Sequence, residues 1–159
     1  MPDASSATCG SGSRAGKATA DSTQRLVPFL GYEDAAAAID WLSGAFGAVE
    51  NRESRHEENG RITHAEVDLE GAIVYLSTPD DYVSSKRHRE TCEAAHAMYD
   101  NPWVIDGHFV EVADVEAHAA RAREHGATIL RGPEEPGTGF RIYTVEDVEG
   151  HRWMFGQRL

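Results

Sequence analysis

The stretch Asp68-Leu69-Glu70-Gly71 returns later in the chain as Asp147-Val148-Glu149-Gly150. A further pair of positions, Gly47 and Gly126, has the same separation of 79 residues, and each glycine follows a segment with helical periodicity. Such agreement in spacing and order is typical of a duplicated structural unit and is poorly explained by chance. The sequence therefore predicts one fold built from two copies of a single motif.

The first copy has the pattern of a β-α-β-β-β unit. Asp34 is suited to cap the start of a helix, and Gly47 is suited to end it. The pair Asn59-Gly60 is a strong signal for a tight hairpin turn, and apolar and polar residues alternate after it. We expect a strand at 26–30, a helix at 35–46, and strands at 49–56, 61–69 and 72–77.

The second copy repeats this order. Asp114 is suited to cap a helix that Gly126 ends, and the glycines and prolines at 132–137 have the composition of a turn. The sequence thus predicts an α+β fold of two βαβββ modules. We expect the second set of elements as a strand at 108–112, a helix at 115–125, and strands at 128–130, 140–146 and 152–156.

The chain has 159 residues, which is a common length for one domain. Residues 1–24 contain few large apolar side chains, so we expect a disordered tail there. We interpret residues 25–159 as a single domain with module one at 25–78, a connector at 79–103 and module two at 104–159. The connector has a helical pattern at 83–98 and is either a lid over a cavity or a passive brace.

Charge and composition limit the classes of partner. The net charge of −12 argues against nucleic acid, whose phosphates this field would repel, but it would attract a cationic small molecule. No apolar run approaches the roughly 20 residues of a membrane span, and the start of the chain lacks an apolar signal segment. We therefore expect a cytoplasmic protein without membrane or nucleic-acid partners. Cys9 and Cys92 support neither a disulfide framework nor a cysteine metal site.

Three stretches, at 34–47, 107–108 and 146–153, make residues 25–157 similar to the glyoxalase/bleomycin resistance protein/dioxygenase (vicinal oxygen chelate) superfamily. The resemblance implies that each module curls a mixed sheet, that a cavity lies between the modules, and that the helices pack outside. It also implies a homodimer.

The metal-dependent members of this superfamily hold a divalent ion on four side chains. The matching positions here are Val27 or Phe29, Tyr75, His108 and Met154, of which only His108 is a good ligand for such an ion. We therefore expect no metal of the usual kind and no cofactor. A different metal site at His64, Glu66 and His108 is the alternative, but polar side chains that face a wet pocket need no metal.

Strand alternation selects the side chains that should face the cavity. The expected ligand-binding residues are His64, Glu66, Tyr75, His108, Arg141, Tyr143 and Met154, with Arg141 as the cationic anchor. The other histidines are expected on surface turns, helix faces or connectors: His56, His88, His96, His118, His125 and His151. Four aromatic residues have the spacing of core positions: Trp41, Phe46, Trp153 and Phe155.

Two functions follow from this set of residues. The first is a non-catalytic binder that sequesters a small aromatic or cationic compound, because most of the usual metal ligands are missing. The second is a lyase, isomerase or dioxygenase in which His64 or His108 moves a proton, with or without a divalent metal. The superfamily hosts both classes of protein, so the resemblance does not decide between them.

Overall fold

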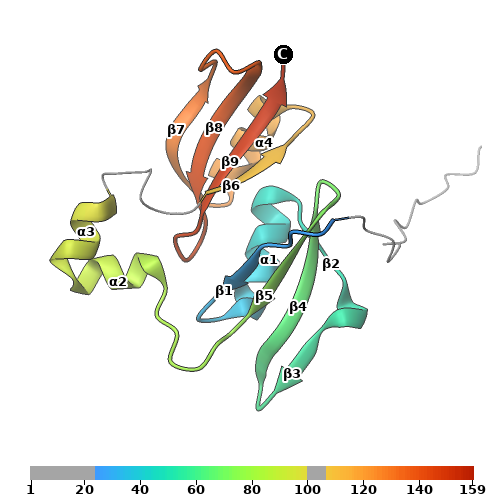
Figure 1. The fold of residues 1–159 in the computed structure, drawn as a ribbon, viewed down its shortest axis with the longest axis vertical. Helices are drawn as coiled ribbons and strands as arrows, with labels where there is room; N and C mark the ends of the chain where they lie inside the picture. The colour runs from blue at the N-terminus through green and yellow to red at the C-terminus, as the bar shows by residue number, and fades with distance from the viewer. Residues whose placement is uncertain (1–23, 100–106) are drawn as a thin grey trace, which may run out of the picture.

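A computed structural model describes residues 24–99 and 107–159 (Figure 1). The predicted disordered tail lies outside these ranges, apart from Gln24. In module one, sheet order is β1-β5-β4-β2, with β3 paired to β4, and in module two it is β6-β9-β8-β7. Module two has the order β-α-β-β-β. Module one has the same order, except that a 3-10 turn divides the strand expected at 49–56 into the two short strands β2 and β3, so the predicted α+β fold is confirmed.

The elements of module one are β1 (Phe29–Gly31), α1 (Ala35–Phe46), β2 (Val49–Glu50), a 3-10 turn (Arg52–Ser54), β3 (His56–Glu58), β4 (Arg61–Leu69) and β5 (Ala72–Ser77). Those of module two are β6 (Gly107–Glu111), α4 (Val115–Glu124), β7 (Thr128–Glu134), β8 (Phe140–Glu146) and β9 (Arg152–Arg158). Asp34 and Asp114 cap their helices as predicted, each accepting a hydrogen bond from the backbone N–H three residues on.

Each sheet has one face covered by its helix, which we call the core face, and an opposite face, which we call the open face. On the core face of sheet one, Val67 and Val74 are register partners and both are buried. On sheet two the corresponding partners are Val145 and Trp153. Burial alternates along these strands because successive side chains point to opposite faces.

Helices α1 and α4 pack against each other, so the two core faces share one hydrophobic core. The Phe46 ring at the end of α1 lies 5.7 Å from the ring of Trp153 and 4.8 Å from that of Phe155. Arg121 on α4 donates hydrogen bonds to the carbonyls of Ala45 and Phe46. The two open faces therefore point away from this shared core.

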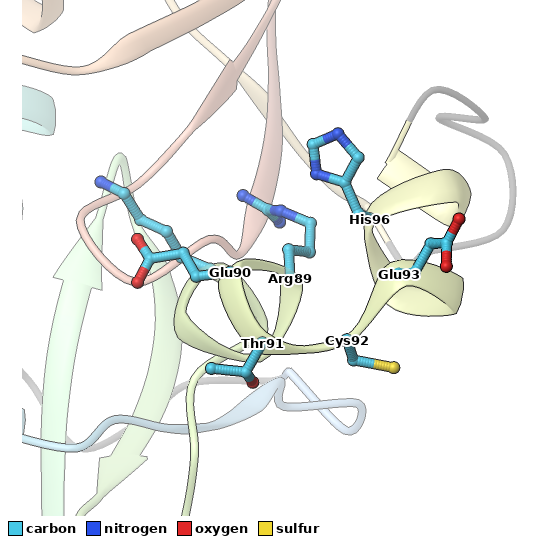
Figure 2. Close-up of a pocket in the computed structure, with 7 residues that line it drawn as sticks. Arg89, Glu90, Thr91, Cys92, Glu93 and His96 are labelled. Atoms are coloured by element: carbon cyan, nitrogen blue, oxygen red, sulfur yellow. The ribbon is translucent and has the colours of Figure 1, made fainter.

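The connector contains two short helices, α2 (Ser85–Thr91) and α3 (Glu93–Tyr99), so the helical pattern at 83–98 is confirmed, with a break at Cys92. The backbone at Cys92 is extended, with φ −131 and ψ 112, and Figure 2 shows the chain changing direction there. None of the α2 side chains is buried. Within the described parts of the chain, no helix is long and apolar enough to cross a membrane.

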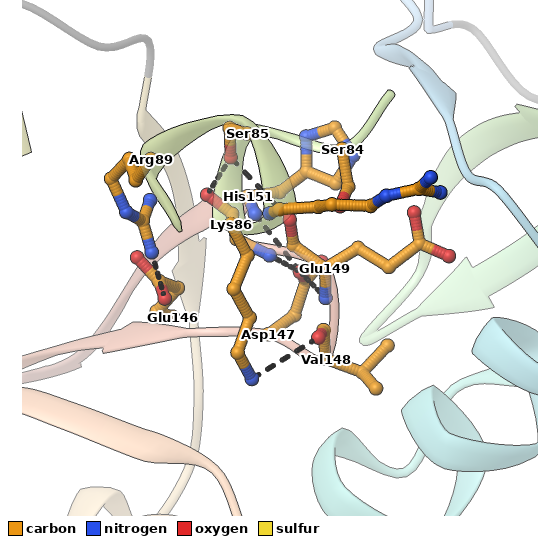
Figure 3. Close-up of polar contacts among 11 residues, drawn as sticks. Ser84, Ser85, Lys86, Arg89, Glu146, Asp147, Val148, Glu149 and His151 are labelled. Carbon is orange, nitrogen blue, oxygen red and sulfur yellow. Dashed lines mark hydrogen bonds and ion pairs between the residues drawn. The ribbon is translucent and has the colours of Figure 1, made fainter. Parts of the chain in front are cut away.

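The start of α2 is fixed to the turn between β8 and β9 (Figure 3). The backbone N–H of Lys86 donates to the Glu149 carbonyl at 3.1 Å, and the Ser85 hydroxyl donates to that of Gly150 at 2.9 Å. Arg89 pairs with the buried Glu146 at 2.7 Å. These contacts favour the brace interpretation for α2.

The same turn also joins module two to module one through the buried carboxylate of Asp147. This carboxylate accepts hydrogen bonds from the Tyr32 hydroxyl at 2.7 Å and from the Trp153 indole N–H at 3.1 Å. It also accepts from three backbone N–H groups of the turn, at residues 149, 150 and 151. Burial, together with the Asp147 charge, raises the pKa of Tyr32 well above its usual value.

We expect Asp147→Asn to lower the free energy of unfolding by about 2–4 kcal/mol, because an amide NH₂ cannot accept the bonds that a buried carboxylate oxygen accepts. Urea denaturation measures this loss. The matched control is Asp68→Asn, since Asp68 occupies the equivalent place in the repeat but is only half-buried and accepts a hydrogen bond from the backbone N–H of Gly71. Equal losses in the two variants would contradict the role given to Asp147.

Candidate functional site

The open face of sheet one carries a polar cluster formed by His64 and Glu66 of β4 and Tyr75 of β5. His64 Nε2 lies 3.4 Å from Glu66 Oε1, and the His64 and Tyr75 rings meet edge to face with centroids 4.8 Å apart. The side chain of Asn51 donates to the second Glu66 oxygen at 3.3 Å. His64 and Glu66 remain 31% and 24% exposed, so a ligand can reach them.

The open face of sheet two carries an apolar and aromatic cluster, and the register partners Glu146 and Arg152 lie on the same face. Phe109 is the register partner of Met154, and the two share this face with Phe140 and Ile142. The Phe109 and Phe140 rings meet edge to face at 5.3 Å, and Phe109 is 45% exposed. Met154 was predicted on this face, but Phe109 and Phe140 were not, because they lie on the neighbouring strands β6 and β8 and strand alternation does not give the register between strands.

Tyr143 does not lie on the open face, and its predicted placement is wrong. Its register partner is Phe155, it is fully buried in the core, and its hydroxyl contacts His118 Nδ1 at 2.6 Å. Arg141 shares this face and pairs with Glu116 of α4 at 2.6 Å, so it is not a cationic anchor beside Met154.

A one-residue offset between the modules explains this error. In module one, Leu69 pairs with Ala72 around a two-residue turn, whereas in module two Glu146 pairs with Arg152 around a five-residue turn. The 79-residue repeat aligns Tyr143 with His64. Because the turn after β8 is longer, however, each residue of β8 is paired one position away from its equivalent in β4. A slip of one residue moves every side chain of a strand to the other face.

His108 also lies one residue away from the open-face position that was expected for it. It pairs with Trp153 on the core face, with ring centroids 4.9 Å apart, and Phe109 takes the open-face position beside Met154. The alternative metal site at His64, Glu66 and His108 is therefore wrong, because His108 lies on a different sheet and on its core face.

The side chains present do not fit the divalent ion that the superfamily holds in its metal-dependent members. The positions that correspond on the open faces are Phe29, Tyr75, Phe109 and Met154, which offer no carboxylate or imidazole. Within residues 24–99 and 107–159, no group of three or more His, Cys, Asp or Glu side chains is arranged to hold a metal ion.

His118 was expected on the surface, but it is buried on α4 between the modules. Its Nε2 donates to the Phe46 carbonyl at 3.2 Å, so its Nδ1 accepts from the Tyr143 hydroxyl. Burial, and secondarily the charge of Arg121, lowers the pKa of His118 to about 4. The ring is therefore a neutral link in the core, and helical spacing with Val115 and Ala122 on the buried stripe of α4 was the signal for it.

A pocket of about 710 Å³ lies at the connector, away from the open-face clusters. Figure 2 shows Arg89 and His96 on one side of the two connector helices, and Thr91 and Cys92 on the other. The side chains that line it include both signs of charge: Lys86, Arg89, Glu90, Thr91, Cys92, Glu93 and His96. This composition is that of a solvated surface groove.

Comparison with known proteins places these features in a family context. The model of the Glyoxalase/Bleomycin resistance protein/Dioxygenase superfamily matches residues 25–155. The uncharacterized protein Mb0911c of Mycobacterium bovis is 33% identical over 132 residues, which cover 83% of this chain and 82% of that protein.

Solved structures share the fold. TioX from Micromonospora sp. ML1 superposes with a TM-score of 0.62 at 29% identity, over 86% of this chain and 97% of TioX. TnmS3 from Streptomyces sp. CB03234, described as an antibiotic binding protein, gives a TM-score of 0.54 at 18% identity, over 87% of this chain and 99% of TnmS3.

We expect His118 to make the protein less stable in mild acid. The unfolded chain binds a proton at this histidine near its usual pKa of 6.5, whereas the folded protein binds it only near 4, so stability falls as the pH drops between these values. The full loss is about 3 kcal/mol. Urea denaturation across this pH range measures it, and His118→Gln should flatten the slope. A His118 ring that titrates near pH 6.5 in the folded protein, followed by NMR, would contradict this account.

Proposed function

Because this chain belongs to the glyoxalase/bleomycin resistance protein/dioxygenase superfamily, we propose that it binds a small aromatic or cationic molecule on the open faces of its two sheets. The observation that carries the proposal is that large side chains on both faces are left accessible to solvent. Phe29 is 60% exposed and Phe109 45% exposed, although the fold buries comparable rings elsewhere. Such surfaces mark ligand or protein contacts.

The polar cluster of sheet one supplies the attraction for a cation. Glu66 offers a carboxylate, and the neighbouring Tyr75 ring offers a π face to a positively charged group. The net charge of −12 adds a long-range field that favours positively charged ligands. At the positions on this face that correspond to the metal ligands, the chain has Phe29 and Tyr75, which offer neither carboxylate nor imidazole, and this supports binding rather than metal chemistry as the use of this face.

The aromatic face of sheet two supplies the apolar contact area. Phe109, Phe140 and Met154 form a surface on which an apolar or aromatic group can displace water. TnmS3 shares this fold, and its description as an antibiotic binding protein supports the view that the fold can hold a small molecule.

The proposed site needs two copies of the chain. The two open faces of one copy point away from its shared core, so they cannot line one cavity together. In a homodimer, the polar face of one copy lies opposite the aromatic face of its partner. A second copy would also cover Phe29 and Phe109, which one copy leaves exposed.

A second candidate function is proton transfer by His64. The contact of 3.4 Å between His64 Nε2 and Glu66 Oε1 favours it, because a carboxylate can orient an imidazole that acts as a general base. Deuterium exchange at the carbon next to the carbonyl of dihydroxyacetone, followed by NMR, tests this function. Exchange above the buffer rate that disappears in His64→Ala would favour catalysis over binding alone.

We expect Glu66→Gln to weaken the binding of tetraethylammonium about tenfold, which corresponds to about 1.4 kcal/mol, because the ligand loses its facing carboxylate. Isothermal titration calorimetry with the full chain measures the affinity. The matched control is Glu70→Gln in the exposed β4–β5 turn, which changes the net charge equally. Equal weakening in both variants would assign the effect to the overall field and would contradict a local site.

We expect sedimentation equilibrium to give twice the chain mass of 17.4 kDa. Phe109→Glu should shift the protein toward the monomer, because the substitution places a charge on the proposed contact face. Glu90→Gln on the connector is the control and should leave the mass unchanged. A wild-type chain that stays monomeric at all concentrations would rule out a site shared between copies.

A further inference from the structure

Gly156 on β9 lies directly beneath the ring of Phe109. A Cβ atom at position 156 would come within 2.6 Å of Phe109 Cζ and 2.9 Å of Phe109 Cε2. Side chains in proteins do not approach this closely, so any larger residue at 156 would push the ring outward. The backbone at Gly156 is not left-handed, so the glycine is required here for space and not for its conformation.

The neighbouring ring is held by contacts of its own. Arg158 places its guanidinium 4.6 Å from the Phe140 ring centroid. Glu111 accepts from two nitrogens of this guanidinium, at 2.8 and 3.2 Å. Phe140 in turn meets Phe109 edge to face. Strands β6, β9 and β8 that carry these residues lie side by side (Figure 1), so the sheet fixes their spacing.

We propose that Gly156 is a specificity-determining residue, which lets Phe109 lie across β9 as a stacking platform and so selects ligands with a planar conjugated ring system. This inference rests on the proposed function, from which it takes the site, and it names the substrate class. A flat ring lying across a strand presents its face to the ligand, whereas a ring pushed up by a side chain at 156 presents its edge.

The chemistry of stacking favours planar ligands over other compounds of equal charge. Stacking of a planar ring on an aromatic side chain contributes about 1–3 kcal/mol, and it requires face-to-face contact over most of the ring. A bulky aliphatic cation can use the carboxylate of Glu66 but gains little from the platform. Discrimination between the two ligand classes therefore depends on Gly156 and Phe109 and not on the polar cluster.

Two cationic probes test the proposal on the full chain. Proflavine is planar and tricyclic and is followed by fluorescence, and tetraethylammonium is not planar and is followed by calorimetry. We expect Gly156→Ala to weaken proflavine binding about tenfold and to leave tetraethylammonium binding unchanged. Phe109→Leu, which removes the ring but retains an apolar side chain, should weaken proflavine binding more than tetraethylammonium binding. The double variant should be no weaker than Phe109→Leu alone, because Gly156 acts through Phe109.

The outcomes separate this inference from the proposed function. If the wild-type chain binds neither probe, both the proposed function and this inference are contradicted. If the wild type binds both probes, but Gly156→Ala and Phe109→Leu weaken neither or weaken both equally, the inference fails and the binding function stands. Should Gly156→Ala unfold the chain, Phe109→Leu alone decides, since it leaves the backbone and position 156 unchanged. Selective loss of proflavine binding supports the proposal.

Discussion

The arrangement of the two modules depends on one buried carboxylate, that of Asp147. It accepts hydrogen bonds from the hydroxyl of Tyr32 in module one, from the indole N–H of Trp153 on β9 and from backbone N–H groups of its own turn. Removing a carboxylate from water is costly, and the five bonds offset that cost only when the two modules are docked. The turn held in this way then places Glu149 at the start of α1 and anchors the first residues of α2.

This docking decides which surfaces remain for function. Because α1 packs against α4, the core faces of both sheets are buried in a single hydrophobic core, and the open faces are directed away from it. The two open faces differ in chemistry: His64 and Glu66 make one polar, and Phe109 and Met154 make the other apolar. A ligand that contacts both must do so across two chains, which links recognition to assembly.

The order of the helices and strands could be predicted from the sequence, because the repeat, the two aspartate caps and the glycine turns are local signals. The break in the strand expected at 49–56, and the extension of β7 to Glu134 into the stretch interpreted as a turn, could not. Most of the predicted residues that lie on the open faces belong to module one, where the two-residue turn after Leu69 preserves strand alternation for His64 and Tyr75; in module two only Met154 was placed on that face. In module two the five-residue turn shifts β8 by one residue, and Tyr143 moves to the core. The five-residue turn is held by the hydrogen bonds of Asp147, one of which reaches Tyr32 in the other module. A contact so distant in sequence leaves no local pattern.

The bonds of Asp147 to Tyr32 and of Glu149 to the backbone of Glu33 join residues 115 and 116 positions apart. Contacts this distant in sequence form only after a large loop has closed. The chain entropy lost in closing that loop slows their formation during folding. During synthesis, module one must leave the ribosome before its partner surface exists, with Tyr32 and α1 still uncovered. The order of synthesis therefore makes the first module dependent on the second for its final structure.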